Sequence, residues 1–163
     1  MGMTKSVFGK TSNGEVVHLV TVSNEKGMSM EVLDYGATLV SVNVPDKDGH
    51  TEDVALGYDD VLDYEKGNAY LGASIGRCGN RVDHAEFSIN GKEYFMEKNE
   101  GENVCHSGPR CYSRRMWDME LLEEENSVRF HLVSTNMAQG FPGTFEVTVT
   151  YTLTEENELK IHY

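Results

Sequence analysis

The sequence has 163 residues, which is enough for one domain with a hydrophobic core and short for two. Its 14 Lys and Arg residues against 27 Asp and Glu residues give a formal net charge of −13. Nucleic acid and anionic membrane surfaces both need a basic face, so this balance argues against them as partners and suits a neutral small molecule.

Composition narrows the class of protein further. Hydrophobic residues make up 39% of the chain, so intrinsic disorder is not expected. No apolar run approaches the roughly 20 residues of a membrane span, and the start "MGMTKSVFGK" lacks the apolar region of a secretory signal. The three cysteines, Cys78, Cys105 and Cys111, lack the spacing of a disulfide framework. We therefore predict reduced thiols in a cytoplasmic protein.

The first half of the chain has hydrophobic residues with a period of two, which is typical of strands rather than helices. Short turns separate the apolar stretches, as in the Pro, Asp and Gly residues of "PDKDGH". One segment, "DDVLDYEKG" at residues 59–67, predicts a short helix closed by Gly67. The predicted strands of this half are 15–23, 28–34, 37–45 and 52–58.

The second half predicts three antiparallel hairpins. In "AEFSINGKEYFM" (85–96), Asn90 and Gly91 supply the positive φ angles of a type I′ turn. Residues 116–134 and 144–163 repeat the pattern of two alternating strands around a polar turn. The whole sequence therefore predicts an all-β protein, an antiparallel β-sandwich, as a single domain over residues 1–163.

The last predicted strand alternates without a closing turn. Leu159, Ile161 and Tyr163 keep the period of two up to the final residue. A domain usually closes its last strand with a turn or a polar tail, so we expect that the sandwich is truncated and continues in a longer protein. A compact terminal strand is the alternative.

Three loops have the composition of functional segments, because loops carry most binding and catalytic residues. They are residues 76–81, "GRCGNR"; residues 99–117, rich in Gly, Asn and Ser around a central histidine; and residues 134–143, which contain "GFPG". No phosphate-binding loop, dinucleotide fingerprint or serine-hydrolase motif is present, so no nucleotide cofactor is expected.

In the first loop, Arg77 and Arg81 can be read in two ways. The plain reading is a structural salt bridge in an acidic protein. The functional reading rests on Asn80 beside Arg81, because an amide and a planar guanidinium together offer the donors and the acceptor that sugar hydroxyls engage.

In the second loop, His106 is the candidate proton carrier, since an unperturbed imidazole titrates near ~6.5. Successive side chains of an extended segment point to opposite faces, so Cys105 is not expected to act with it. Cys105, His106 and Cys111 also lack the spacing of a zinc site, and no metal is predicted. His84 is a secondary candidate.

Two aromatic residues have alternative interpretations. Trp117 and Phe141 could form an apolar floor for a sugar ring, although core packing is the expected role of Trp117.

Taken in order, the sequence blocks resemble the galactose mutarotases, or aldose 1-epimerases. The likeness runs from about Val32 to the last residue and is carried by the blocks "DYGATLVSVNVPDKDG", "DVALGYDDVLDY", "YLGASIGRCGNRV…AEFSINGKEY", "NVCHSGPRCYSRRMW" and "GFPGTFEVTVTYTLTEENELKIHY". The resemblance implies a large β-sandwich with an open hexose cleft in which Asn80, Arg81 and His106 contact the sugar. Ser107 stands where the family's L-H-G-G loop has its first glycine, and Cys105 where it has leucine.

The family resemblance also implies a reaction, the interconversion of the α and β anomers of hexoses such as galactose and glucose, without a cofactor. Its glutamate base and histidine acid come from a later half of the family's sequence, so they cannot be assigned here. We therefore expect an N-terminal half that is inactive alone. The alternatives are a non-catalytic carbohydrate-binding module, or an assembly fragment whose edge strand pairs with the C-terminal half or another copy.

Overall fold

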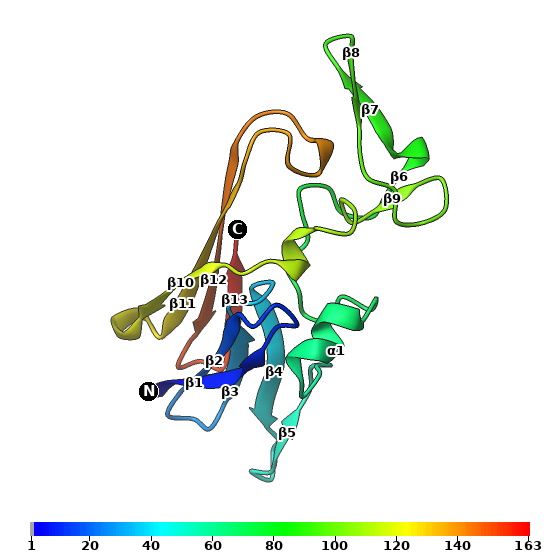
Figure 1. The fold of residues 1–163 in the computed structure, drawn as a ribbon. Coiled ribbons are helices and arrows are strands. Elements are labelled where there is room, and N and C mark those ends of the chain that lie inside the picture. Colours follow the sequence, from blue (N-terminus) through cyan, green and yellow to red (C-terminus); the bar gives the residue numbers. More distant parts are fainter. Residues whose placement is uncertain (1) are drawn as a thin grey trace.

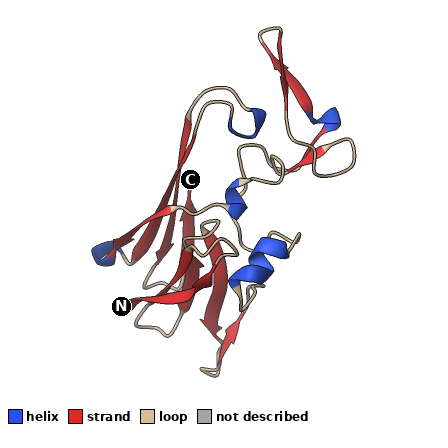
Figure 2. Cartoon of the chain, in the orientation of Figure 1, coloured by secondary structure: helices blue, strands red, loops and turns tan. Residues whose placement is uncertain are grey.

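The computed structural model describes residues 2–163 and consists mainly of two stacked antiparallel sheets (Figures 1 and 2). Each sheet is a meander in which sequential strands are neighbours. The strands of the first sheet are β1 (Gly2–Lys10), β2 (Val16–Ser23), β3 (Ser29–Leu33), β4 (Thr38–Pro45) and β5 (Thr51–Asp53). Those of the second are β10 (Asp118–Leu122), β11 (Ser127–Ser134), β12 (Phe145–Leu153) and β13 (Leu159–His162).

The main core lies between the two sheets, because every second side chain of the inner strands is apolar. Val20 and Val22 from the first sheet are fully buried, as are Phe130 and Val149 from the second. Phe130 packs edge-on against Tyr151, with ring centroids 6.0 Å apart. Tyr151 donates its hydroxyl hydrogen to the Ala37 carbonyl at 2.8 Å, so its one polar group is satisfied in the core.

The one α-helix within residues 2–163, α1 (Val61–Lys66), covers the other face of the first sheet. Asp60 caps its N-terminus by accepting a hydrogen bond from the Leu62 amide at 2.7 Å, and Gly67 ends it. Val61 and Tyr64 face inward and pack with buried residues of the sheet. The helix predicted at residues 59–67 is confirmed.

A third region projects from the sandwich and carries two small ladders (Figure 1). In one, β6 (Arg81–Val82) pairs with β9 (Val104–Cys105); in the other, β7 (Glu86–Ile89) pairs with β8 (Lys92–Phe95). Ala85, Met96 and Val104 form its own small buried cluster. The short 3-10 helices of the chain are Asp83–Ala85, Tyr112–Arg114, Glu123–Glu125 and Ala138–Gly140.

The antiparallel all-β class predicted from the sequence is confirmed, and so are the three hairpins. Two strand predictions need correction. β1 was not predicted, because its apolar residues Met3, Val7 and Phe8 do not keep a regular period of two, and a register irregularity lies between Val7 and Gly9. The strand expected at 52–58 ends at Asp53, whose carboxylate accepts the amides of Val42 and Ala55 and replaces the ladder.

Two further expectations concern cysteines and membranes. Cys78, Cys105 and Cys111 are free thiols, and Cys111 is buried. Within residues 2–163, every helix is too short or too polar to cross a membrane.

Candidate functional site

A hollow of about 470 Å³ lies where the projecting region meets the sandwich. Two of the three residues predicted to bind sugar, Arg81 and His106, line it. The third, Asn80, is not part of the lining but forms hydrogen bonds with both of them. The other side chains that matter for its chemistry are Tyr70, Glu100, Cys105 and Arg114.

The short β6–β9 ladder brings the first two loops together. The ladder pairs Arg81 with Cys105, and two hydrogen bonds between the next residues, Asn80 and His106, extend it. The His106 amide donates to the Asn80 carbonyl at 2.9 Å, and the Asn80 amide donates to Nδ1 of His106 at 3.0 Å. Two segments that lie 26 positions apart at Asn80 and His106 are thus held together.

The backbone at His106 explains why it shares the hollow with Cys105. His106 has a φ of 52°, in the left-handed region, so the segment is no longer extended there. Strict alternation of side chains holds only for extended residues, so the premise that separated Cys105 from His106 does not apply at His106. Both residues line the same hollow.

The bond from Asn80 also sets the tautomer of His106. A backbone amide can only donate, so Nδ1 must be the unprotonated nitrogen of the neutral ring. The proton of the neutral imidazole is then on Nε2, which becomes a hydrogen-bond donor. The Tyr70 ring packs edge-on against the imidazole, with centroids 4.7 Å apart, and fixes its plane.

Arg81 is held by a carboxylate that the sequence analysis did not single out. Its Nε and Nη2 donate to the two oxygens of Glu100 at 2.5 and 2.6 Å, and its Nη1 donates to Oδ1 of Asn80 at 3.2 Å. A guanidinium has five N–H groups, so two remain for a ligand. The hydrogen bond from Arg81 lowers the pKa of Glu100 below its usual range, and the same bond raises the pKa of Arg81. Both groups are therefore charged at neutral pH.

Arg77 has a different role from Arg81, although the two lie in one loop. Its guanidinium donates to the carbonyls of Ser134, Thr135, Pro142 and Gly143 at 2.8–3.0 Å, and to the Ser134 hydroxyl at 3.1 Å. It also lies 5.8 Å from the ring centroid of Phe141. Arg77 thus ties the first loop to the "GFPG" corner. Its role is structural, as one of the two interpretations of the sequence predicted, but its partners are mainly backbone carbonyls instead of a carboxylate.

The remaining sequence candidates lie outside the lining of the hollow. His84 is exposed and contacts Asp83 at 3.0 Å. Trp117 is only 4% exposed and donates to the Tyr112 carbonyl, so it packs in the core as expected. Phe141 stacks on Phe87 with centroids 5.3 Å apart. The apolar floor proposed for these two aromatic residues is therefore not formed; Tyr70 supplies an aromatic wall instead.

Solved structures define the class to which this fold and hollow belong. The chain superposes on a GalM/aldose epimerase homologue from C. elegans with a TM-score of 0.80 at 34% identity, covering 86% of this chain and 43% of that one. It superposes on galactose 1-epimerase from Lactobacillus acidophilus with a TM-score of 0.84 at 26% identity, covering 99% and 47%. The fold is a galactose mutarotase-like β-sandwich.

Sequence comparison then assigns the family. The aldose 1-epimerase family matches residues 18–163, and the chain belongs to it. The aldose 1-epimerase of Haemophilus influenzae is 41% identical over 151 residues, which cover 93% of this chain and 43% of the relative. The galactose mutarotase of Sus scrofa is 32% identical over 164 residues, which cover 100% and 47%. The chain spans about half the length of the curated relatives it matches.

Proposed function

We propose that this chain supplies the sugar-binding part of a cytoplasmic aldose 1-epimerase that interconverts the α and β anomers of hexoses such as galactose and glucose. One observation carries the proposal: Arg81 and His106, with Asn80 behind them, meet at a single hollow. The two free N–H groups of Arg81 and the Nε2–H of His106 are donors suited to hydroxyl and ring oxygens of a pyranose.

In the proposed reaction, a base removes the proton of the C1 hydroxyl while an acid protonates the ring oxygen O5, so that the C1–O5 bond breaks and leaves an aldehyde at C1 and a hydroxyl at C5. Rotation about C1–C2 and closure on the other face give the second anomer. Arg81 and His106 orient the ring and polarise its oxygens. Proton balance needs only the acid and the base, and no cofactor.

We further propose that the acid and the base are not supplied by this chain. Glu100, the carboxylate of the hollow, is engaged through both oxygens by Arg81, which lowers its pKa and makes it a weak base. His106 already uses Nδ1 as an acceptor, and its Nε2 carries a proton. Each group is therefore suited to binding instead of proton transfer.

Calorimetry and polarimetry on the 163-residue chain test these proposals separately. We expect galactose or glucose to bind, while the optical rotation of fresh α-glucose or α-galactose decays no faster than in buffer. A well-folded chain that binds neither sugar would contradict the binding site. Accelerated decay by the chain alone would contradict an external acid and base, whereas activity restored by a separately expressed C-terminal half would support it.

The alternative of a non-catalytic carbohydrate-binding module is favoured by the same engagement of Glu100. It predicts sugar binding without activity even when the C-terminal half is added.

An assembly role has its own observation. β13 pairs only with β12 within residues 2–163, and near its free edge Ile161 is 45% exposed. Light scattering tests this role: a strictly monomeric, well-folded chain would count against pairing with another copy.

A further inference from the structure

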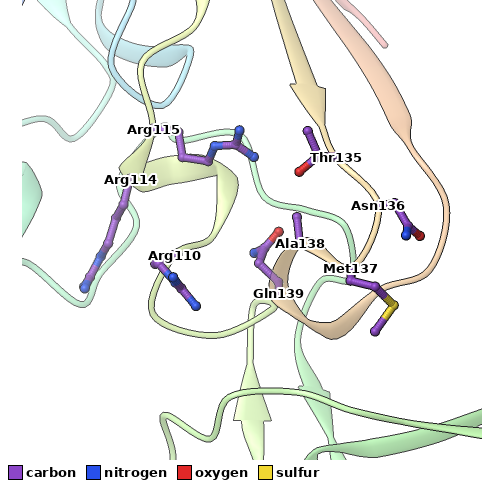
Figure 3. Close-up of a pocket in the computed structure, with 8 residues that line it drawn as sticks. All are labelled: Arg110, Arg114, Arg115, Thr135, Asn136, Met137, Ala138 and Gln139. Carbon is purple, nitrogen blue, oxygen red and sulfur yellow. The ribbon is translucent and has the colours of Figure 1, made fainter.

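A second hollow, of about 530 Å³, lies beside the first (Figure 3). Arg110, Arg114 and Arg115 form one wall, and residues 135–139 of the loop between β11 and β12 form the other. Arg114 borders both hollows, so they are neighbours separated by the segment that leads into β10. The proposed sugar site does not use this second hollow.

The charge of the second hollow is opposite to that of the molecule. Three of the six arginines in the sequence line it, and its lining contains neither Asp nor Glu, although the chain has a net charge of −13. In the first hollow, Glu100 lines the surface and pairs with Arg81, whereas Glu97, the partner of Arg110, lies outside the lining of the second hollow. A positive hollow in an acidic protein creates a local potential that attracts anions.

The hydrogen bonds of Arg115 leave most of its donors available. Its Nη2 donates to the Val133 carbonyl at 3.0 Å, and among the described residues no carboxylate lies within ion-pair distance of it. In Figure 3 its guanidinium extends across the hollow toward Thr135. A charged guanidinium with free N–H groups matches an oxyanion in both charge and hydrogen-bonding geometry.

The other two arginines contribute unequally. Arg110, below Arg115 in Figure 3, has one solvent-exposed contact, from Nη2 to Glu97 at 3.2 Å, and keeps its remaining donors. The guanidinium of Arg114 points away from the hollow, and its Nη2 donates to the Gly67 carbonyl and to Oδ1 of Asn68. Arg115 and Arg110 are therefore the direct binding groups, and Arg114 adds positive field.

The facing wall is held in place by bonds to the rest of the protein. Nε2 of Gln139 donates to the Ser107 carbonyl at 3.1 Å and to the Gly76 carbonyl at 3.4 Å. Arg77 holds the Thr135 carbonyl at 2.9 Å. The hollow is thus formed before any ligand arrives, which reduces the ordering cost of binding.

We propose that this second hollow is a binding site for a phosphate group. A phosphate carries about −1.5 to −2 charges at neutral pH and several strong acceptor oxygens, which match two guanidinium forks and the positive field of a third. A neutral sugar would leave that charge uncompensated. A carboxylate, with one negative charge and two oxygens, would satisfy one fork only.

The test is calorimetry of inorganic phosphate binding to the 163-residue chain at low ionic strength. We expect R115Q and R110Q each to weaken phosphate binding by about tenfold or more. R129Q is the matched control, because it removes the same charge at a place away from the hollow. Arg129 lies on β11 and pairs with the exposed Glu120. We expect R129Q to bind phosphate as the wild type does, and added NaCl to weaken binding in both.

Absence of phosphate binding by the wild-type chain would overturn the proposal, as would equal weakening by R129Q and R115Q, which would mean diffuse charge. Thermal unfolding of each variant shows that it is folded, and the two arginine variants test the site independently. Sugar affinity, measured on the same samples, should not change in R110Q. The proposal of a phosphate site and the proposal of a sugar site can therefore be rejected independently.

Two sources could supply the phosphate group. Comparing inorganic phosphate with methyl phosphate distinguishes them. Tighter binding of the ester would assign the site to the phosphate group of a larger metabolite, and tighter binding of inorganic phosphate would assign it to the free ion; both outcomes require the arginine dependence described above.

Discussion

Arg77 and Arg81 lie four residues apart in one glycine-rich loop, yet they belong to different regions of the molecule. Arg77 is surrounded by backbone carbonyls of the loop between β11 and β12, and it fastens that loop to the body of the protein. Arg81 faces a hollow, where one carboxylate and one amide hold it with two N–H groups free. The same type of side chain fastens a loop where backbone carbonyls surround it, and it keeps N–H groups available where it faces a hollow.

The largest expected effect comes from Arg77→Ala, which removes five hydrogen bonds and leaves carbonyls of the corner without partners. We expect a loss of about 2–4 kcal/mol in the free energy of unfolding, measured by urea denaturation. Arg129→Ala, an exposed control, should change it by about 0.5 kcal/mol or less. Equal effects of the two substitutions would remove the structural distinction of Arg77.

Arg81→Ala should have the opposite profile. We expect hexose affinity to fall by about tenfold, or about 1.4 kcal/mol, because two charged donors are lost from the hollow. The free energy of unfolding should change far less than in Arg77→Ala, since the side chain is 58% exposed and its ion pair is solvent-accessible. Unchanged affinity by calorimetry would remove Arg81 from the sugar site.

His106→Asn separates the two functions of the imidazole. The asparagine Oδ1 can replace Nδ1 as the acceptor of the Asn80 amide, but no group replaces the Nε2–H donor. We therefore expect sugar affinity to fall severalfold, by about 1 kcal/mol, with the unfolding midpoint nearly unchanged. His106→Gln, which reaches the Nε2 position, should retain more affinity; the reverse order would contradict the assigned tautomer.

The smallest effect concerns pH. Hydrogen bonding to Arg81 lowers the pKa of Glu100 below its ordinary value of 4.5, so the pair is intact above that value and is lost as the pH falls through the lowered pKa. The contribution of this pair to sugar affinity should hold from neutral pH to about 4.5 and decline only below it. In Glu100→Gln, the decline due to this pair should disappear.

Glu102→Gln is the control for the pH experiment. Lys98 likewise lowers the pKa of Glu102, but this carboxylate does not line the hollow. Its substitution should leave the pH profile of sugar binding as in the wild type. A profile altered equally by both substitutions would contradict a specific role of Glu100.

The fold was largely predictable from local patterns, and the exceptions have physical reasons. Alternating apolar residues predicted the strands that face the core, and Asn90-Gly91 predicted one hairpin turn. β1 was not predicted from the sequence, because its strand structure depends on backbone pairing with β2 and its apolar residues lack a regular period of two. Asp53 ends β5 through a side-chain contact to another strand, which a local pattern does not encode.

The site was predictable only in part. Asn80, Arg81 and His106 could be chosen because motifs name residue types in fixed order. Glu100 and Tyr70 could not, because nothing in their neighbourhood distinguishes them from other polar loop residues. Their roles follow from the β6–β9 ladder, which brings distant segments to one hollow.

By itself, therefore, the sequence determined the antiparallel class of the protein, its turns and the residue types available for binding, because these depend on periodicity and local backbone preference. Only the tertiary structure decided which arginine faces a hollow and which fastens a loop, which nitrogen of His106 accepts the Asn80 amide, and where three arginines gather. Those outcomes depend on distances between segments far apart in the chain, and such distances are set by packing.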